Sequence, residues 1–254
     1  MSEPRTASRA VPALSLALSV ALAPASSARA SSDVQALLQR ADAFRLAAGS
    51  VQVLTQVEVQ VGGKPDKERV YLVYTKPGRR SLVVSRSPVE KGQKVLMLGD
   101  DFWIVLPSSQ RPLRITPAQK LLGDASTGDV ATMTWAEDYD GAVAGDAEVD
   151  GAPCVKLDLT AQRKGVTYTR VELYLAKADG HPVQADLYVA SGRQAKHAAF
   201  EMGTAEGKPA VVAMTLRDTI QTNRQTVIRY LSRSRKALDD AYYNPMYLTH
   251  HDPQ

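Results

Sequence analysis

The sequence has 254 residues, of which 44% are hydrophobic and 23% charged, a balance typical of a folded globular chain rather than a disordered one. The formal net charge is +4, and Arg5, Arg9 and Arg29 against Glu3 place +2 of it in the first 30 residues. The rest of the chain therefore carries a net charge too small to indicate a nucleic-acid-binding protein.

Residues 1–30 have the pattern of a cleavable secretory signal. Arg5 and Arg9 precede an apolar run over residues 11–23, and residues 26–30 end in a small-x-small cleavage pattern. The apolar run is shorter than the roughly 20 residues that a membrane-spanning helix needs. A buried core helix is the alternative. We expect residues 31–254 to form one soluble domain that works outside the cytoplasm.

Cys154 is the single cysteine of the chain. It lies far from the predicted cleavage site, so we expect no lipid anchor there, and a single cysteine forms no internal disulfide. Val155, Leu157 and Leu159 follow it at strand spacing, which predicts a buried thiol. The mature chain of about 224 residues is long enough to stabilise itself by one sizeable core.

The mature chain begins with a predicted helix and then changes to strands. Over residues 33–48, apolar residues recur at spacings of three and four, and Ser32 can cap the start. Gly49 ends that pattern. Over residues 51–61, valines alternate with polar residues, as in a strand that is buried on one face.

Turn signals then recur at short intervals between alternating segments. The segments at residues 155–159, 171–175, 183–189 and 212–216 place apolar side chains on one face. Short connections between such strands require antiparallel neighbours. About ten or eleven strands are expected, and a sheet of that size curls toward a barrel.

Two regions depart from this rhythm. Residues 95–98 and 102–106 are apolar on both faces, so we expect the sheet to be covered on both sides there. Residues 117–122 suit a short helix with a proline at its first position. Residues 123–129 suit a loop, and residues 130–139 a second short helix or an irregular lid. The concave face of the sheet is either filled by its own helices or left with a cavity.

Residue types that support catalysis are scarce. His181, His197, His250 and His251 lack the spacing of metal ligands, and no nucleophile elbow or phosphate loop occurs. The segment from Asp124 to Asp129 lacks the alternating ligands of a calcium loop. We therefore expect a protein that is not an enzyme and that has no cofactor and no metal.

The remaining charged clusters have structural interpretations. Asp100 and Asp101 stand in a predicted turn, and Asp124 and Asp129 flank a predicted loop. These carboxylates are expected to cap loops or to pair with Arg111 and Arg114. A basic run near the C-terminus is either a solvated face or a contact with acidic lipid headgroups. It consists of Arg229, Arg233, Arg235 and Lys236.

Over most of the mature chain, and most sharply across residues 93–140, the sequence resembles the LolA-like outer-membrane lipoprotein-sorting family, and more specifically its uncharacterised periplasmic branch. The resemblance rests on three segments: 99–107 (GDDFWIVLP), 111–115 (RPLRI) and 121–130 (LLGDASTGDV). Within them, the matching motif positions are Asp101, Trp103, Pro107, Arg111, Arg114, Gly123, Asp124 and Asp129.

This resemblance implies a mainly β, half-open antiparallel barrel of about eleven strands, with helices forming a lid over a hydrophobic cavity. It implies a monomeric periplasmic carrier that binds the acyl chains of a lipoprotein or lipid for transfer toward the outer membrane. An inner-membrane lipid exporter and an outer-membrane acceptor would be its partners. A sterol- or hopanoid-like lipid is an alternative cargo.

A lipid- or lipoprotein-sensing module partnered with a membrane protein is the alternative function, and a hydrolase is a third. The candidate residues for lining a cavity are apolar and lie on the central strands, the late strands and the insert. They are Leu98, Phe102, Ile104, Leu106, Leu121, Leu122, Trp135, Val212, Met214 and Leu216.

Overall fold

The computed structural model describes residues 25–46, 49–123, 125–131, 134–219 and 223–253. Its first helix, α1, spans Ala25–Arg45, which confirms a helix in the region predicted over residues 33–48. Val34, Leu38 and Ala41 of this helix are fully buried. Residues 1–24 of the predicted signal lie outside the described residues, and residues 25–30, which include the predicted cleavage pattern, form the first part of α1. The signal and its cleavage stay a prediction.

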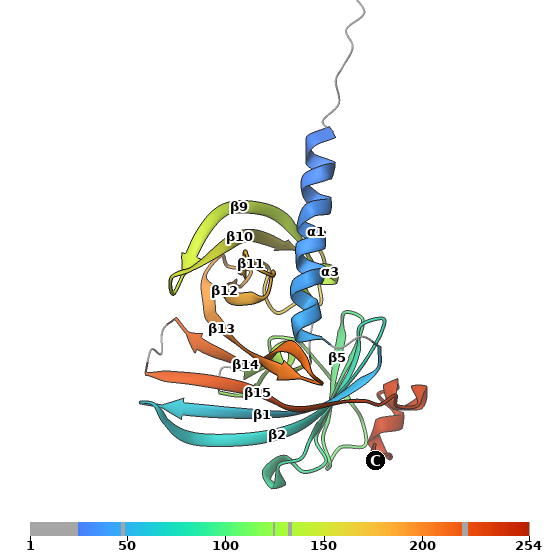
Figure 1. Cartoon of the computed structure of the whole chain (residues 1–254). Coiled ribbons are helices and arrows are strands. Elements are labelled where there is room, and N and C mark those ends of the chain that lie inside the picture. Colours follow the sequence, from blue (N-terminus) through green and yellow to red (C-terminus); the bar gives the residue numbers. More distant parts are fainter. Residues whose placement is uncertain (1–24, 47–48, 124, 132–133, 220–222, 254) are drawn as a thin grey trace, which may run out of the picture.

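In the described part of the chain, thirteen strands form one antiparallel sheet that does not close (Figure 1). Their spatial order is β6-β5-β4-β3-β2-β1-β15-β14-β13-β12-β11-β10-β9. The strands are β1 (Val51–Val61), β2 (Lys64–Lys76), β3 (Arg80–Ser85), β4 (Lys94–Leu98), β5 (Asp101–Val105), β6 (Leu113–Ile115), β9 (Tyr139–Val149), β10 (Ala152–Ala161), β11 (Arg170–Ala176), β12 (Pro182–Tyr188), β13 (Gln194–Ala205), β14 (Lys208–Asp218) and β15 (Arg224–Arg235).

The expected count of about eleven strands was too low. Strand β9 contains mostly glycine, alanine and acidic residues, which carry little strand propensity, and its pairing with β10 provides the stabilisation that its sequence lacks. Strand β6 is three residues long and pairs with β5 at the edge of the sheet. Both β9 and β6 are therefore stabilised by pairing with a neighbouring strand rather than by the strand propensity of their own residues.

The sheet curls so that its concave face holds the main hydrophobic core. Figure 1 shows β9–β12 above and β1, β2 and β15 below, with α1 running beside β9–β12 and ending above β14. Val57 on β1, Leu173 on β11 and Leu216 on β14 are fully buried in this core, together with Leu38 of α1. Each comes from the inward face of an alternating strand or from the buried face of the helix.

The opposite face of β2–β5 is also covered, which confirms the expectation for residues 95–98 and 102–106. Val95 and Met97 of β4 face the concave core, whereas Leu96 between them packs into a second cluster. This second cluster is completed by the C-terminal segment after β15, with two short 3₁₀ helices, η2 (Asp240–Tyr243) and η3 (Tyr247–Thr249). A third 3₁₀ helix, η1 (Pro88–Glu90), links β3 to β4.

The insert between β6 and β9 differs from its prediction at two points. The loop expected over residues 123–129 contains a short strand and the start of a one-turn helix. Residues 117–122 do not form a helix, because β7 (Lys120–Leu122) pairs with β8 (Ala125–Ser126) in a small hairpin. The carbonyls of Pro117 and Gln119 accept from the backbone N–H groups of Gly128 and Thr127 instead of bonding within a helix. Two one-turn helices follow, α2 (Thr127–Val130) and α3 (Trp135–Asp138). None of the described helices is both long enough and apolar enough to cross a membrane.

Candidate functional site

The interior of the curved sheet holds a small cavity beneath α2 and α3. Its volume is about 50 Å³, far below the roughly 300–1,000 Å³ of a typical ligand pocket. This cavity is therefore too small to hold a ligand of typical size. The lining residues are Arg45, Gly128, Asp129, Thr134, Trp135, Tyr139, Thr167, Tyr168, Val171, Leu187, Ala198, Phe200 and Met214.

Trp135 at the start of α3 is the largest apolar group over this cavity. Its ring meets that of Phe200 on β13 edge to face, with the ring centroids 5.5 Å apart. The guanidinium of Arg45 lies 3.9 Å from the centroid of the Trp135 ring, a cation–π contact. Trp135 thus joins α1, α3 and the late strands where the insert closes the interior.

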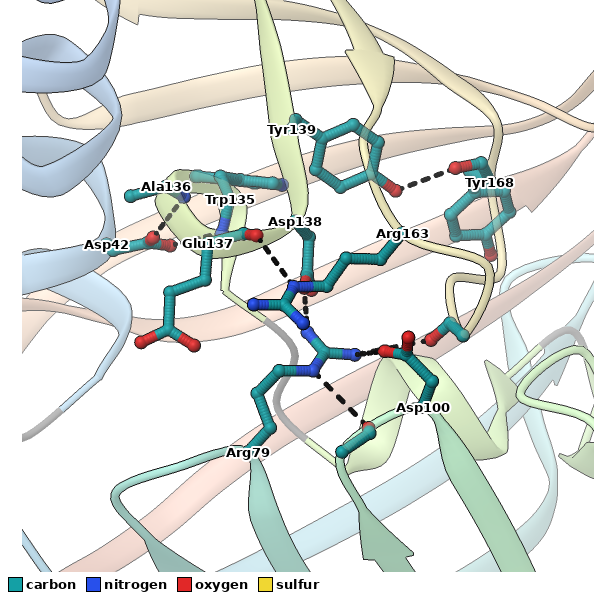
Figure 2. A network of polar contacts seen from close by, with 12 residues as sticks. Asp42, Arg79, Asp100, Trp135, Ala136, Glu137, Asp138, Tyr139, Arg163 and Tyr168 are labelled. Carbon is teal, nitrogen blue, oxygen red and sulfur yellow. Dashed lines mark hydrogen bonds and ion pairs between the residues drawn. The ribbon is translucent and has the colours of Figure 1, made fainter.

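The first turn of α3 is capped by α1 rather than by its own N-cap residue. The carboxylate of Asp42 accepts from the backbone N–H of Trp135 at 3.1 Å and of Ala136 at 2.9 Å (Figure 2). Thr134, the N-cap residue, makes no side-chain cap. Burial raises the pKa of Asp42, while Arg45 at 3.2 Å and the two N–H groups favour its charged form. Asp42 therefore fixes α3 against α1.

An ion pair holds the C-terminal end of α3 to the sheet. Asp138, with no exposed surface, forms an ion pair with Arg79 in the turn between β2 and β3 (Figure 2). Arg79 also donates to the carbonyls of Gly99 at 3.3 Å and Gly165 at 3.4 Å, and it lies 3.4 Å from Asp100. One guanidinium thus joins α3 to the β2–β3, β4–β5 and β10–β11 connections.

Arg163 adds a second cation beside Asp138. Its Nε donates to the carbonyl of Glu137 at 3.0 Å and lies 3.9 Å from the Asp138 carboxylate. Among the described residues, no hydrogen bond of normal geometry reaches either carboxylate oxygen of Asp138. Charge pairing, rather than a hydrogen-bond network, therefore holds this buried carboxylate. Burial lowers the pKa of Arg79, because removing the guanidinium from water disfavours its charged form.

Helix α2 is fixed by a third set of contacts, centred on Asp129. Asp129 and Ser126 form a reciprocal capping box at the start of α2. The same carboxylate accepts from the Tyr168 hydroxyl at 2.9 Å and from Lys196 Nζ at 2.8 Å. Burial and the charge of Asp129 raise the pKa of Tyr168. This arrangement confirms the loop-capping role expected for Asp129.

The residues predicted to line a cavity are placed in several environments. Phe102, Ile104, Leu121, Trp135, Met214 and Leu216 belong to the concave core, where Trp135 and Met214 border the cavity. Leu98 packs on the opposite face, and Val212 lines a separate cleft beside β15. Leu106 is partly buried just after β5. Leu122 lies in β7, and its side chain is outside the described part of the structure.

The motif residues at β5 and β6 have structural contacts. Asp101 forms an ion pair with Arg114 across β5 and β6, which confirms the expected carboxylate–arginine pairing. The Arg114 guanidinium lies 5.8 Å from the Trp103 ring centroid, and Trp103 packs into the outer cluster. The backbone carbonyl of Arg111 accepts from Ser109 Oγ at 2.6 Å in the loop before β6.

Two more motif residues, Pro107 and Gly123, lie at close-packed contacts. A Cβ at Gly92 would lie 3.1 Å from Pro107 Cγ, so Pro107 packs directly on the turn before β4. Gly123 has φ +58°, and a Cβ there would lie 2.5 Å from Thr226 Oγ1 on β15. The hairpin of the insert therefore needs a glycine at this contact. Asp124 lies outside the described residues.

The residues that hold α3 in place, Asp42 and Arg79, were not among the predicted site residues. Asp42 had a detectable signal, because it lies four residues after Leu38 and so shares the buried face of the helix. No sequence signal marked Arg79, since a basic residue in a Pro-Gly turn is usually solvated. Its partner Asp138 is distant in sequence, and the fold alone brings the two together.

This arrangement of a curved open sheet, an N-terminal helix and a helical insert defines a LolA-like fold. Over residues 78–250 the sequence matches the model of a family described as an uncharacterized protein, and the chain belongs to that family. A LolA superfamily protein from Nitrosomonas europaea is 26% identical with a TM-score of 0.77, covering 84% of this chain and 98% of that one.

Two further solved structures share the fold. A DUF1329 family protein from Desulfovibrio piger is 24% identical with a TM-score of 0.69, covering 86% of this chain and 99% of that one. A putative outer membrane lipoprotein-sorting protein domain from Vibrio parahaemolyticus is 17% identical, also with a TM-score of 0.69, covering 85% and 98%. No curated protein matches the sequence.

Proposed function

We propose that the protein is a periplasmic carrier that binds the acyl chains of a lipoprotein or lipid inside its curved sheet and transfers them toward the outer membrane. The observation that carries this proposal is an apolar interior closed by an insert whose two short helices are held at their ends by polar contacts. The LolA-like fold supports it.

The small volume of the cavity means that cargo binding requires the insert to move. Opening separates Asp138 from Arg79 and α3 from Asp42, and water then solvates the groups that were buried. The cost is moderate because desolvation opposes the ion pair in the closed state. An acyl chain that enters stabilises the open form by about 0.8 kcal/mol for each methylene removed from water.

The interior offers suitable surfaces for such a chain. Met214 and Phe200 border the cavity, and methionine adapts its shape to irregular apolar ligands. Trp135 would shift with α3 and open a space beside them, which its ring would continue to border. The proposed cargo thus replaces the side-chain contacts that the insert makes in the closed state.

Purified protein spanning residues 31–254 should be extracted with organic solvent and analysed by mass spectrometry, then titrated with a fluorescent fatty acid. We expect lipid in the organic extract, or saturable binding of the fluorescent fatty acid. Replacing Met214, which borders the cavity, in the variant Met214→Gln should weaken probe binding. The matched control is Met246→Gln, at a methionine that is 54% exposed. A folded protein with no bound lipid and no probe binding would refute the carrier.

A transfer assay with two vesicle populations tests the direction of the proposal. A carrier accelerates exchange of a labelled acyl lipid from donor to acceptor vesicles in proportion to its concentration. Binding of the lipid without faster exchange would instead support a sensing module that signals to a membrane partner.

A further inference from the structure

Strands β14 and β15 separate partway along their length. They pair only where residues 213–217 of β14 lie opposite residues 225–229 of β15. Beyond that point, residues 208–211 of β14 stay paired with β13, and residues 230–235 of β15 stay paired with β1. We call this separation the β14–β15 fork. It forms a cleft of about 270 Å³.

Two β-bulges produce the fork. Val212 is the extra residue in the β13–β14 pairing, and Leu231 is the extra residue in the β1–β15 pairing. A bulge bends its strand and ends regular pairing. Both extra residues line the cleft, and Leu231 is 51% exposed. The fork therefore carries apolar groups at an opening in an otherwise continuous sheet.

The bulge at Leu231 also changes which side chains of β15 face inward. Before it, Tyr230 lies opposite the buried Thr55 and packs against the concave core. After it, Ser232 lies opposite Leu54, which belongs to the outer cluster, and Arg233 lies opposite Val53, which packs on the concave core. One extra residue thus turns Arg233 to the concave side.

Arg233 is partly buried on the concave side, and its guanidinium has N–H donors beyond the one hydrogen bond that it makes. It donates to the carbonyl of Val211 at 2.7 Å across the fork, and its guanidinium lies 5.4 Å from the Tyr230 ring centroid. No carboxylate of the described residues lies within ion-pair distance of it. Glu206, on the same cleft, is exposed to water. Burial lowers the pKa of Arg233, as expected for a cation without a close counter-ion.

Tyr230 stands between the fork and the interior. It lines the cleft and packs against the concave core, and the charges of both Arg45 and Arg233 act on its hydroxyl. Arg45 belongs to the lining of the cavity under α3. The lower end of α1 lies close above β14 in Figure 1. Tyr230 therefore separates the outer cleft from the cavity under α3, and an acyl chain going from one to the other would have to displace it.

We propose that the β14–β15 fork is a lateral portal for an amphiphile with an anionic headgroup, which Arg233 holds while the acyl chain passes Tyr230 into the interior. This inference rests on the proposed function and specifies its cargo as an anionic acyl lipid. The guanidinium gives a charged headgroup a charge-assisted hydrogen bond, and Val212 and Leu231 cover the first methylenes of the chain.

The test compares a dansyl-labelled fatty acid with its methyl ester at about pH 8, where the free carboxyl is ionised. Arg233→Gln should weaken binding of the acid about tenfold and leave the ester nearly unchanged. The matched control is Arg229→Gln on the same strand, whose arginine lies 3.5 Å from Glu58. That variant should bind both probes like the wild type.

A second arm tests the route. In a Cys154→Ala background, Leu231→Cys labelled with a bulky thiol reagent should slow uptake of the acid several-fold, whereas labelled Val89→Cys, at a residue that is 77% exposed, should not. If the wild type binds both probes but neither Arg233→Gln nor the label has an effect, the portal is wrong and the carrier stands. If a folded wild type binds neither probe, both proposals fall.

Discussion

At the residue scale, the pairing of Arg79 with Asp138 combines two buried charges from distant parts of the chain. Arg79→Met leaves the carboxylate without its main counter-ion at a position with no exposure. We expect a loss of about 3–5 kcal/mol in the free energy of unfolding, because an uncompensated charge remains buried. Urea denaturation followed by circular dichroism measures this loss.

The double variant Arg79→Met/Asp138→Asn separates charge from packing. Removing the carboxylate's charge should recover about 2 kcal/mol, since the largest part of the penalty is an unpaired buried ion. If the double variant is as unstable as Arg79→Met alone, the contribution of Arg79 comes from its hydrogen bonds to Gly99 and Gly165 instead.

Gly123 presents a second prediction at this scale. A Cβ there would lie 2.5 Å from Thr226 Oγ1 and 2.6 Å from Val59 Cγ2, in addition to φ +58°. We expect Gly123→Ala to lower the free energy of unfolding by about 2–4 kcal/mol, from overpacking together with backbone strain. Thermal unfolding under identical conditions measures it.

The control for Gly123 is Gly192, which has φ +77° but where an added Cβ would have no atom within 4 Å. Gly192→Ala should cost only the strain of a left-handed residue, about 1–2 kcal/mol. Equal losses in the two variants would show that the insert does not need its close approach to β1 and β15.

At the element scale, the C-terminal segment is the cover for the outer face of β2–β5. Leu248 of η3 is fully buried, and its carbonyl accepts from the buried Lys94 at 2.9 Å. We expect Leu248→Ala to lower the free energy of unfolding by about 2–4 kcal/mol. Met246→Ala, two residues earlier and exposed, should change it by less than about 0.5 kcal/mol. Comparable losses would contradict the covering role.

The strands could be predicted where alternation is strong, as at β1, where the predicted range 51–61 is the range observed. The hairpin that begins in residues 117–122 could not be predicted, because the proline and the two leucines suit a helix as well as a hairpin. Backbone bonds from Gly128 to Pro117 and from Thr127 to Gln119 decide between them. Both bonds reach beyond the next turn of a helix, to partners that the local residue pattern does not specify.

The covering of both faces of β4 and β5 was predictable, but its source was not. An apolar run indicates that both sides are buried without naming the partner. The partner is a C-terminal segment whose short 3₁₀ helices lack the periodicity that marks a longer helix. The bulges at Val212 and Leu231 were equally hidden, since a one-residue shift leaves no mark in composition.

At the scale of the whole molecule, the thirteen-stranded sheet curls around an apolar interior. Charged side chains fix the short helices of the insert over that interior. The cavity under α2 and α3 is small, about 50 Å³. A carrier of the kind proposed would hold no preformed pocket. It would exchange contacts within the protein for contacts with cargo, and the polar contacts that fix α3 would set how readily that exchange begins.

The two tryptophans of the chain give the most direct measurement of the central claim. Trp135 lies over the cavity, whereas Trp103 packs on the outer face of the sheet. Fatty acids brominated along the chain quench tryptophan fluorescence on contact. In Trp103→Phe, which leaves Trp135 as the sole reporter, the account predicts saturable quenching, and in Trp135→Phe it predicts almost none. Quenching of Trp103 alone, or of neither tryptophan, would contradict binding of acyl chains in the interior.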